Sequence, residues 1–279
     1  MNAWRFALTK RWFGYLALAI VFAIVCCFLC AWQLSRRAEA RVEIDRIDAN
    51  YSSEPVALAD ALPSLDGFDE SDKWMPVTVT GTYLTDLQTL VRNRPYSGSP
   101  GFEVLVPLLL EDGSVFIVDR GWVSPGSEQD LPDEIPDAPS GTVTVTARLK
   151  AGEPTLPGRS APAGQIATIN LPDMESRVGE PTYTGAYGLM VTEDPSPADR
   201  PLEAAKPVRD EGPHLSYAFQ WLVFALFGFI GLGYALVQEY RVVNAEDPEE
   251  IIRAEERRIK REKRAKSDAE IEDELLDAR

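Results

Sequence analysis

Two long uncharged stretches constrain the fold of this chain more than any other feature. One runs from Trp12 to Ser35, the other lies between His214 and Glu239, and each has 24 residues that are mostly apolar. As a helix with a rise of about 1.5 Å per residue, such a stretch is long enough to cross a hydrocarbon layer of about 30 Å. We therefore predict two transmembrane helices, at 12–35 and 214–238.

The first stretch could also belong to a cleavable signal peptide. Such a peptide has an apolar core of about 7–15 residues that ends at a small-residue cleavage site. The stretch here is longer and ends in the sequence AWQLSRR. Trp12 and Trp32 stand one bilayer thickness apart, as residues of the two interfacial belts do. We therefore expect an uncleaved anchor that follows a short cytoplasmic N-terminus at 1–11.

Basic residues indicate the orientation of the two helices. Nine Lys and Arg fall between Arg241 and Lys266, whereas only Lys206 and Arg209 closely precede the second helix. Arginines also follow the first helix, so the bias there is weak or reversed. The positive-inside rule then places both termini, including a charged tail at 239–279, in the cytoplasm. The lack of an Arg/Ser-rich presequence favours a multi-pass protein of the bacterial inner (cell) membrane over a mitochondrial one.

The segment between the helices, 36–213, is predicted to be an external β-rich domain. Several of its segments alternate apolar and polar residues and are rich in Val and Thr, which is typical of strands. A short helix is expected at 171–179, and the first transmembrane helix could continue as a stem through 36–48. The fold class we predict is two transmembrane helices bracketing one mostly antiparallel β domain, barrel- or sandwich-like, with one or two short helices. The predicted strands are 75–83 with its hairpin partner 87–94, 102–110, 115–123, 141–150, 165–170 and 183–192.

Composition excludes some classes of function. Between Ala38 and Pro213 there are 13 Lys and Arg against 30 Asp and Glu, and such a domain would repel the phosphates of nucleic acid. All three cysteines, Cys26, Cys27 and Cys30, lie in the first apolar stretch, where Cys is usually a small packing residue. The β domain therefore has no disulfide or thiolate metal site. It also lacks a nucleotide-binding glycine motif and a nucleophile elbow, so we expect no enzyme.

Two short motifs could carry a function. Arg120-Gly121-Trp122 ends a predicted strand, where it is either structural, with Arg120 paired to a neighbouring carboxylate such as Asp119, or a docking patch. His214 is the only histidine and starts the second apolar helix. It is either a residue of the membrane interface or a ligand of haem iron or another transition metal.

Four sequence blocks resemble the surfeit-locus-one (Surf1-like) family, membrane proteins that assist the assembly of cytochrome c oxidase. They are Trp32-Gln33-Leu34 followed by basic residues, the strand with Val77, Val79, Gly81 and Tyr83, the segment from Gly101 through Asp119-Arg120-Gly121-Trp122-Val123, and His214-Leu215-Ser216-Tyr217-Ala218-Phe219-Gln220-Trp221. The resemblance covers most of residues 12–240. Departures include Asp119, where the family often has Asn.

The resemblance implies a non-enzymatic assembly factor that acts in the respiratory chain, as a chaperone for the catalytic, haem-bearing subunit of the oxidase. It also implies binding of haem a, with His214 as a candidate axial ligand of the iron and Tyr217, Gln220 and Trp221 as its surroundings. Membrane lipid is the other expected partner. Two alternatives stay open at this point: a scaffold that docks on the oxidase without haem, and an unrelated membrane-anchored receptor or sensor domain.

Overall fold

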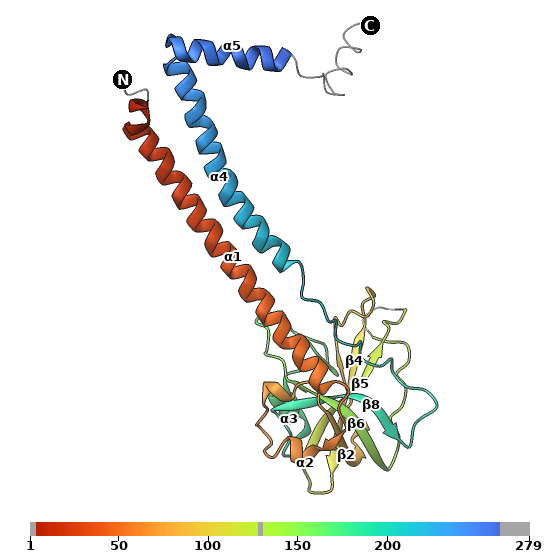
Figure 1. The fold of residues 1–279 in the computed structure, drawn as a ribbon. Coiled ribbons are helices and arrows are strands. Elements are labelled where there is room, and N and C mark those ends of the chain that lie inside the picture. The colour runs from red at the N-terminus through yellow and green to blue at the C-terminus, as the bar shows by residue number, and fades with distance from the viewer. Residues whose placement is uncertain (1–3, 128–130, 263–279) are drawn as a thin grey trace. The chain divides into compact units, whose positions relative to one another are not determined.

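The computed structural model describes residues 4–127 and 131–262, which belong to two compact units (Figure 1). One unit comprises residues 1–38 and 212–279, and the other comprises 39–211. Helix α1 (Lys10–Asn50) contributes to both units, because the division falls within it. The part of the predicted charged tail beyond Glu262 lies outside the described residues.

The first unit contains the two predicted membrane helices. Both α1 and α4 (His214–Val243) are long and apolar enough to cross a membrane, and only 11% and 0% of their most apolar windows is buried within the protein. A core helix of a water-soluble protein would be mostly buried, so these side chains need another apolar environment. The unit also contains η1 (Arg5–Leu8) and α5 (Pro248–Glu262), which follows α4 after a short turn.

Within this unit, α1 and α4 lie side by side and run antiparallel (Figure 1). Near their middle, Gly228 lies so close to Phe22 that an added Cβ would be 3.2 Å from the phenyl ring. At one end Arg11 forms an ion pair with Glu239. Small residues let apolar helices approach closely, which is how helices associate in lipid.

The second unit is built on a closed β-barrel. Strand β2 pairs with β6 on one side and, through residues 81–83, with β4 on the other, which closes the ring β2-β6-β8-β5-β4. Most pairs of long strands are antiparallel, and β5–β8 is parallel. The barrel strands are β2 (Pro76–Tyr83), β4 (Phe102–Leu110), β5 (Val115–Val123), β6 (Thr142–Ala151) and β8 (Ala186–Asp194).

Short elements extend this barrel. Strand β1 (Val56–Ala57) pairs with β2, while β3 (Thr89–Val91) and β7 (Gln165–Ile166) continue the sheet from β4. The remaining elements are α2 (Leu58–Ala61), η2 (Glu70–Asp72), η3 (Thr85–Leu87) and α3 (Leu171–Val178). The predicted fold class is confirmed: two candidate membrane helices flank, in the sequence, a barrel-like domain with a few short helices.

The barrel interior is filled by alternate residues of its strands. On β6, for example, Val143, Val145, Ala147 and Leu149 are fully buried, while the residues between them are less buried. A second apolar cluster lies on the outer face of β5, which is therefore buried along its whole length. The outer cluster includes residues of α1, α3 and β8, among them Ile47, Met174 and Tyr187.

One predicted pairing is wrong. Residues 87–94 were expected to form a hairpin with 75–83, but β3 pairs with β4 and β7 instead. The intervening residues 85–87 form a 3-10 turn, and the N–H of Leu84 donates to the carbonyl of Pro107 on β4. Alternation of apolar and polar residues predicts a strand but not its partner, because that choice depends on distant residues.

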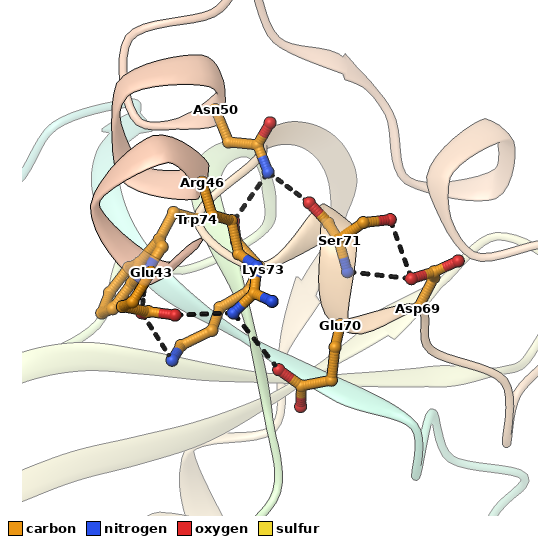
Figure 2. Close-up of polar contacts among 8 residues, drawn as sticks. All are labelled: Glu43, Arg46, Asn50, Asp69, Glu70, Ser71, Lys73 and Trp74. Atoms are coloured by element: carbon orange, nitrogen blue, oxygen red, sulfur yellow. Dashed lines mark hydrogen bonds and ion pairs between the residues drawn. The ribbon is translucent and has the colours of Figure 1, made fainter. Parts of the chain in front are cut away.

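The predicted stem of α1 is confirmed as helix and is clamped within the second unit by polar contacts (Figure 2). The carboxylate of Glu43 accepts hydrogen bonds from Lys73 Nζ at 2.8 Å and from Trp74 Nε1 at 3.0 Å. One turn further along, Arg46 pairs with Glu43, and then Asn50 donates to the carbonyls of residues 71 and 73. Burial alone would raise the pKa of Glu43, but the hydrogen bonds from Lys73 and Trp74 outweigh it and hold that pKa below its ordinary value.

We predict that Glu43→Gln lowers the free energy of unfolding at pH 7 by about 1–2 kcal/mol, since hydrogen bonds to a charged group are lost. Because the folded pKa of Glu43 is depressed, its stabilising contribution is present above the ordinary pKa of 4.5 and is lost as the pH falls below it. Thermal unfolding of the full chain in detergent, followed by tryptophan fluorescence, measures this. The control is Asp45→Asn, an exposed carboxylate on the same helix. A constant difference between wild type and Glu43→Gln from pH 7 to pH 3 would contradict the assignment.

Candidate functional site

His214 stands at the first turn of α4, where the backbone changes direction. Gly212 has a φ of +69°, and Pro213 follows it as the residue before the helix. The carbonyl of Pro213 accepts the first helical hydrogen bond, from the N–H of Tyr217 at 3.1 Å. The left-handed glycine and the proline therefore stop the preceding segment and start the helix at His214.

The imidazole of His214 contacts the other membrane helix. Its Nδ1 lies 2.8 Å from Oε1 of Gln33 on α1, and both residues are half-buried. The opposite edge of the ring faces Gly212, where an added Cβ would lie 3.3 Å from Cδ2 and Nε2. Among the residues that the structure describes, Nε2 has no hydrogen-bond partner, so one of the two ring nitrogens is available to a ligand.

The other residues predicted around His214 differ in how far they are exposed. Tyr217 is 46% exposed, and Gln220 is also exposed. Trp221 is half-buried and contacts Phe224 edge to face, with ring centroids 5.7 Å apart. Within residues 4–127 and 131–262, no hydrogen bond or ring contact joins Tyr217, Gln220 or Trp221 to His214. The structure instead pairs His214 with Gln33, which lies 181 residues away in the sequence and which spacing along one helix could not reveal.

The candidate ligand set for a metal is a single nitrogen. The described part of the chain contains no group of three or more His, Cys, Asp or Glu side chains that could hold a metal ion. Cys26 is buried, Cys30 is half-buried and Cys27 is exposed. A lone imidazole fits a metal that brings its other ligands with it, as haem iron does in its porphyrin.

The Arg120-Gly121-Trp122 motif lies on β5, and its arginine is inside the barrel. The side chains of Arg120 and Glu193 are 0% and 1% exposed, and Nη2 lies 2.7 Å from Oε1. The other carboxylate oxygen accepts from Arg120 Nε at 3.2 Å and from the hydroxyl of Tyr83 at 3.0 Å. The guanidinium also donates to the carbonyls of Pro136 and Asp137. Burial raises the pKa of Tyr83 above its ordinary value, so its hydroxyl stays a neutral donor.

The predicted partner of Arg120, Asp119, is wrong. Successive residues of a strand point to opposite faces, so the side chain of Asp119 lies on the outer face of β5 while Arg120 points into the barrel. The position of Arg120 favours the structural interpretation of the motif over direct docking through its charge, because a guanidinium that is 0% exposed cannot reach a partner protein.

Gly121 and Trp122 hold a distant segment against the end of β5. Trp122 exchanges backbone hydrogen bonds with Leu202 at 2.7 and 2.9 Å, and its indole N–H donates to the carbonyl of Arg94. An added Cβ at Gly121, where φ is +128°, would lie 2.2 Å from the carbonyl oxygen of Leu202. Only glycine allows this approach. Next to it is a cavity of about 420 Å³ whose lining includes Trp122, Pro136 and Leu202.

Comparison with known proteins assigns the family. The SURF1 family model matches residues 20–226. This chain belongs to the SURF1 family. An uncharacterized SURF1-like protein of Mycobacterium tuberculosis (strain H37Rv) is 36% identical over 236 residues, which are 82% of this chain and 85% of the relative. SURF1-like proteins of Rickettsia bellii and Monosiga brevicollis are 24% and 27% identical over 223 and 230 residues, which cover 78% and 77% of this chain and 86% and 85% of those relatives.

The part of the chain that matches the SURF1 family contains both candidate sites. Gln33, the Arg120-Gly121-Trp122 motif and the turn from His214 to Trp221 all lie between residues 20 and 226. Helix α5 lies beyond the match. The earlier expectation of this family, drawn from four short sequence blocks, is therefore confirmed.

A second polar cluster of this SURF1 family member is buried on the outer face of β5. Asp119 is 1% exposed and accepts a hydrogen bond from the N–H of Gly121 at 2.9 Å, but its Oδ2 has no partner among the described residues. Burial, and then the nearby charge of Glu103, raise the pKa of Asp119 well above its ordinary value. Glu103 pairs with Arg94 at 2.9 Å, and Arg94 also pairs with Glu153 at 2.5 Å. Asp119 is thus the buried acid of this cluster that lacks a cation.

We predict that Arg120→Met lowers the free energy of unfolding by about 3–5 kcal/mol, because it leaves the carboxylate of Glu193 buried without a partner. The double variant Arg120→Met/Glu193→Leu should recover a large part of this loss. Denaturant unfolding of the full chain in detergent measures both effects. A variant Arg120→Met that unfolds like wild type, yet fails to support oxidase assembly, would show instead that Arg120 serves in docking.

We further predict that Asp119→Asn stabilises the protein at pH 7, by about 1–3 kcal/mol, the usual cost of an unsatisfied buried polar group. The amide of Asn keeps an acceptor for the N–H of Gly121 and removes the negative charge that Asp119 would carry near Glu103. Because the folded pKa of Asp119 is raised, wild type loses stability as the pH rises above the ordinary value of 3.8, so the advantage of Asn should vanish near pH 4.

Thermal unfolding between pH 4 and pH 8 measures the effect of Asp119→Asn. The control is Asp112→Asn, at an exposed turn where hydrogen bonds from Ser114 hold the pKa of the carboxyl below its ordinary value. Its pH dependence should have the opposite sign. If Asp119→Asn were less stable than wild type at pH 7, the assignment of a neutral buried acid would be wrong.

Proposed function

We propose that this SURF1 family member is a membrane-bound assembly factor for haem–copper cytochrome c oxidase and that it assists the insertion of haem a into the catalytic subunit. The family is linked to oxidase assembly in general, which supports the first part. The observation that carries the second part is the state of His214. It is the only histidine of the chain, and its Nδ1 is engaged by Gln33 while its Nε2 is engaged by none of the residues that the structure describes.

These residues fit the requirements of a haem ligand. The axial position of haem iron takes the lone pair of a neutral imidazole nitrogen, and Nε2 of His214 can supply it. Gly212 itself has no side chain to press against that edge of the ring. Tyr217 and Gln220 expose polar groups on the same two turns of α4, and Trp221 adds an aromatic surface. When bound, the haem would be a cargo that His214 holds and releases.

A carrier, rather than an enzyme, is the function that we propose. In the β domain, two sets of ionic groups make structural contacts. Arg120 and Glu193 neutralise each other inside the barrel, and Glu43 holds the stem of α1. The role we assign to this domain is to present a docking face to the oxidase, at the rim formed by Trp122 and the exposed Leu202.

We also propose that the protein lies in a bacterial cell membrane with both termini in the cytoplasm. Two helices long and apolar enough to cross a membrane support membrane location, and the positive-inside rule supports the orientation. In this orientation His214, at the start of α4, is at the outer surface.

We predict that His214→Asn reduces bound haem at least about tenfold. Asn can still donate a hydrogen bond to Gln33 from the position of Nδ1, but it has no nitrogen with a free lone pair for iron. The measurement is the ratio of haem a to protein, from absorbance and pigment extraction, after purification in detergent from cells that synthesise haem a. The control is Ser216→Ala, an exposed polar residue on the same turn.

The oxidase supplies the second readout of this experiment. If His214→Asn kept the haem content of wild type, His214 would not be the ligand. If wild type bound no haem, yet cells without the protein made oxidase polypeptide that lacked haem a, the scaffold alternative would replace the carrier. Normal oxidase in cells without the protein would contradict a function in assembly.

A further inference from the structure

Gln33 is the hydrogen-bond partner of the His214 ring. A carbonyl oxygen can only accept a hydrogen bond, so Oε1 of Gln33, 2.8 Å from Nδ1 of His214, pairs with the tautomer that carries the proton on Nδ1. A neutral imidazole has one N–H, and its Nε2 then holds a free lone pair. This differs from a histidine in water, which prefers to carry the proton on Nε2.

We propose that Gln33 is the positioning residue of the ligand site: it holds His214 as the neutral Nδ1–H tautomer and keeps the lone pair of Nε2 available for a metal. The identity of the metal, haem iron, rests on the proposed function. The tautomer does not, since it is a property of the two side chains alone. Histidines that bind metals usually donate their other N–H to such an acceptor, and loss of the acceptor costs about 10–100-fold in metal affinity.

The choice of an amide at position 33 follows from the same argument. A carboxylate there would attract a second proton to the ring, and the resulting imidazolium has no lone pair for iron. The amide oxygen orients the ring without adding a charge. Gly212 complements it on the opposite edge, because a side chain there would approach both Cδ2 and Nε2. The ring is therefore held through Nδ1 and left open at Nε2.

The chain offers a direct measurement, because it has one histidine. The full-length protein, labelled with ¹⁵N-histidine and purified in detergent without haem, gives signals from only two ring nitrogens. We expect a protonated Nδ1 and an unprotonated Nε2 at a pH where the ring is neutral. Gln33→Leu should move the proton to Nε2. Gln33→Glu should restore the proton on Nδ1 at high pH. The matched control is Gln238→Leu, which removes an amide from α4 far from His214.

Titration with haem gives an independent result. Gln33→Leu should weaken haem binding by about 10–100-fold, while Gln238→Leu should leave the affinity within about a factor of three of wild type. The proposal is overturned if wild type carries the proton on Nε2, which would mean that the amide of Gln33 donates. It is also overturned if Gln33→Leu leaves both the tautomer and the affinity unchanged while His214→Asn abolishes binding.

The two proposals fail in distinguishable ways. A protonated Nδ1 that depends on Gln33, in a protein that never binds haem, would support the positioning role and contradict the carrier function. Haem binding that depends on His214 and is indifferent to Gln33 would support the carrier function and contradict the positioning role.

Discussion

The barrel depends on one buried ion pair, between Arg120 and Glu193. Two charges at 0% and 1% exposure are stable only when each is fully hydrogen bonded. The additional partners come from β2, through Tyr83, and from the loop carbonyls of Pro136 and Asp137. Strands β2, β5 and β8 are thereby tied together at one level of the barrel. A pair of this kind adds little net free energy, but it excludes other arrangements, because any of them would leave a charge buried alone.

On the outer face of β5, a buried acid lacks such a complete set of partners. Asp119 is buried without a cation of its own, and burial together with Glu103 keeps its pKa well above the ordinary value. The shift favours the protonated form of this acid, because no cation is bonded to it. Alternation along β5 therefore places a paired charge inside the barrel and an acid with a raised pKa outside it, in two residues that are adjacent in the sequence.

Local patterns predicted much of the fold. The bounds of β4 and β5 were predicted to the residue, because both are mostly apolar and flank the turn at 111–114. The two membrane helices and the stem of α1 were also predicted, since apolar length and helical continuity are local properties. Contacts between distant residues could not be predicted in this way. The hairpin assigned to 87–94 and the pairing of Arg120 with Asp119 both failed, because each assumed that a neighbour in the sequence is a neighbour in space.

The candidate site was predicted only in part, for the same reason. His214 could be found because it is the sole histidine beside an apolar helix, and the resemblance to the SURF1 family gave it a ligand. The contact that decides its chemistry is with Gln33, on another helix and 181 residues away. The resemblance pointed instead to Tyr217 and Gln220, among others, and the structure leaves both exposed.

The physical difference between the two motifs lies in how completely their polar atoms are satisfied. Arg120 has acceptors for Nε and for both terminal nitrogens, so each of its nitrogens is engaged within the protein. In His214, Nδ1 is paired with Gln33, and none of the described residues forms a hydrogen bond with Nε2. A buried polar group that is fully satisfied holds a structure together, whereas a half-satisfied one at a surface can bind a ligand without breaking any bond that the fold requires. By this criterion the arginine motif is part of the framework, and the histidine turn is the site to which we assign the proposed haem cargo.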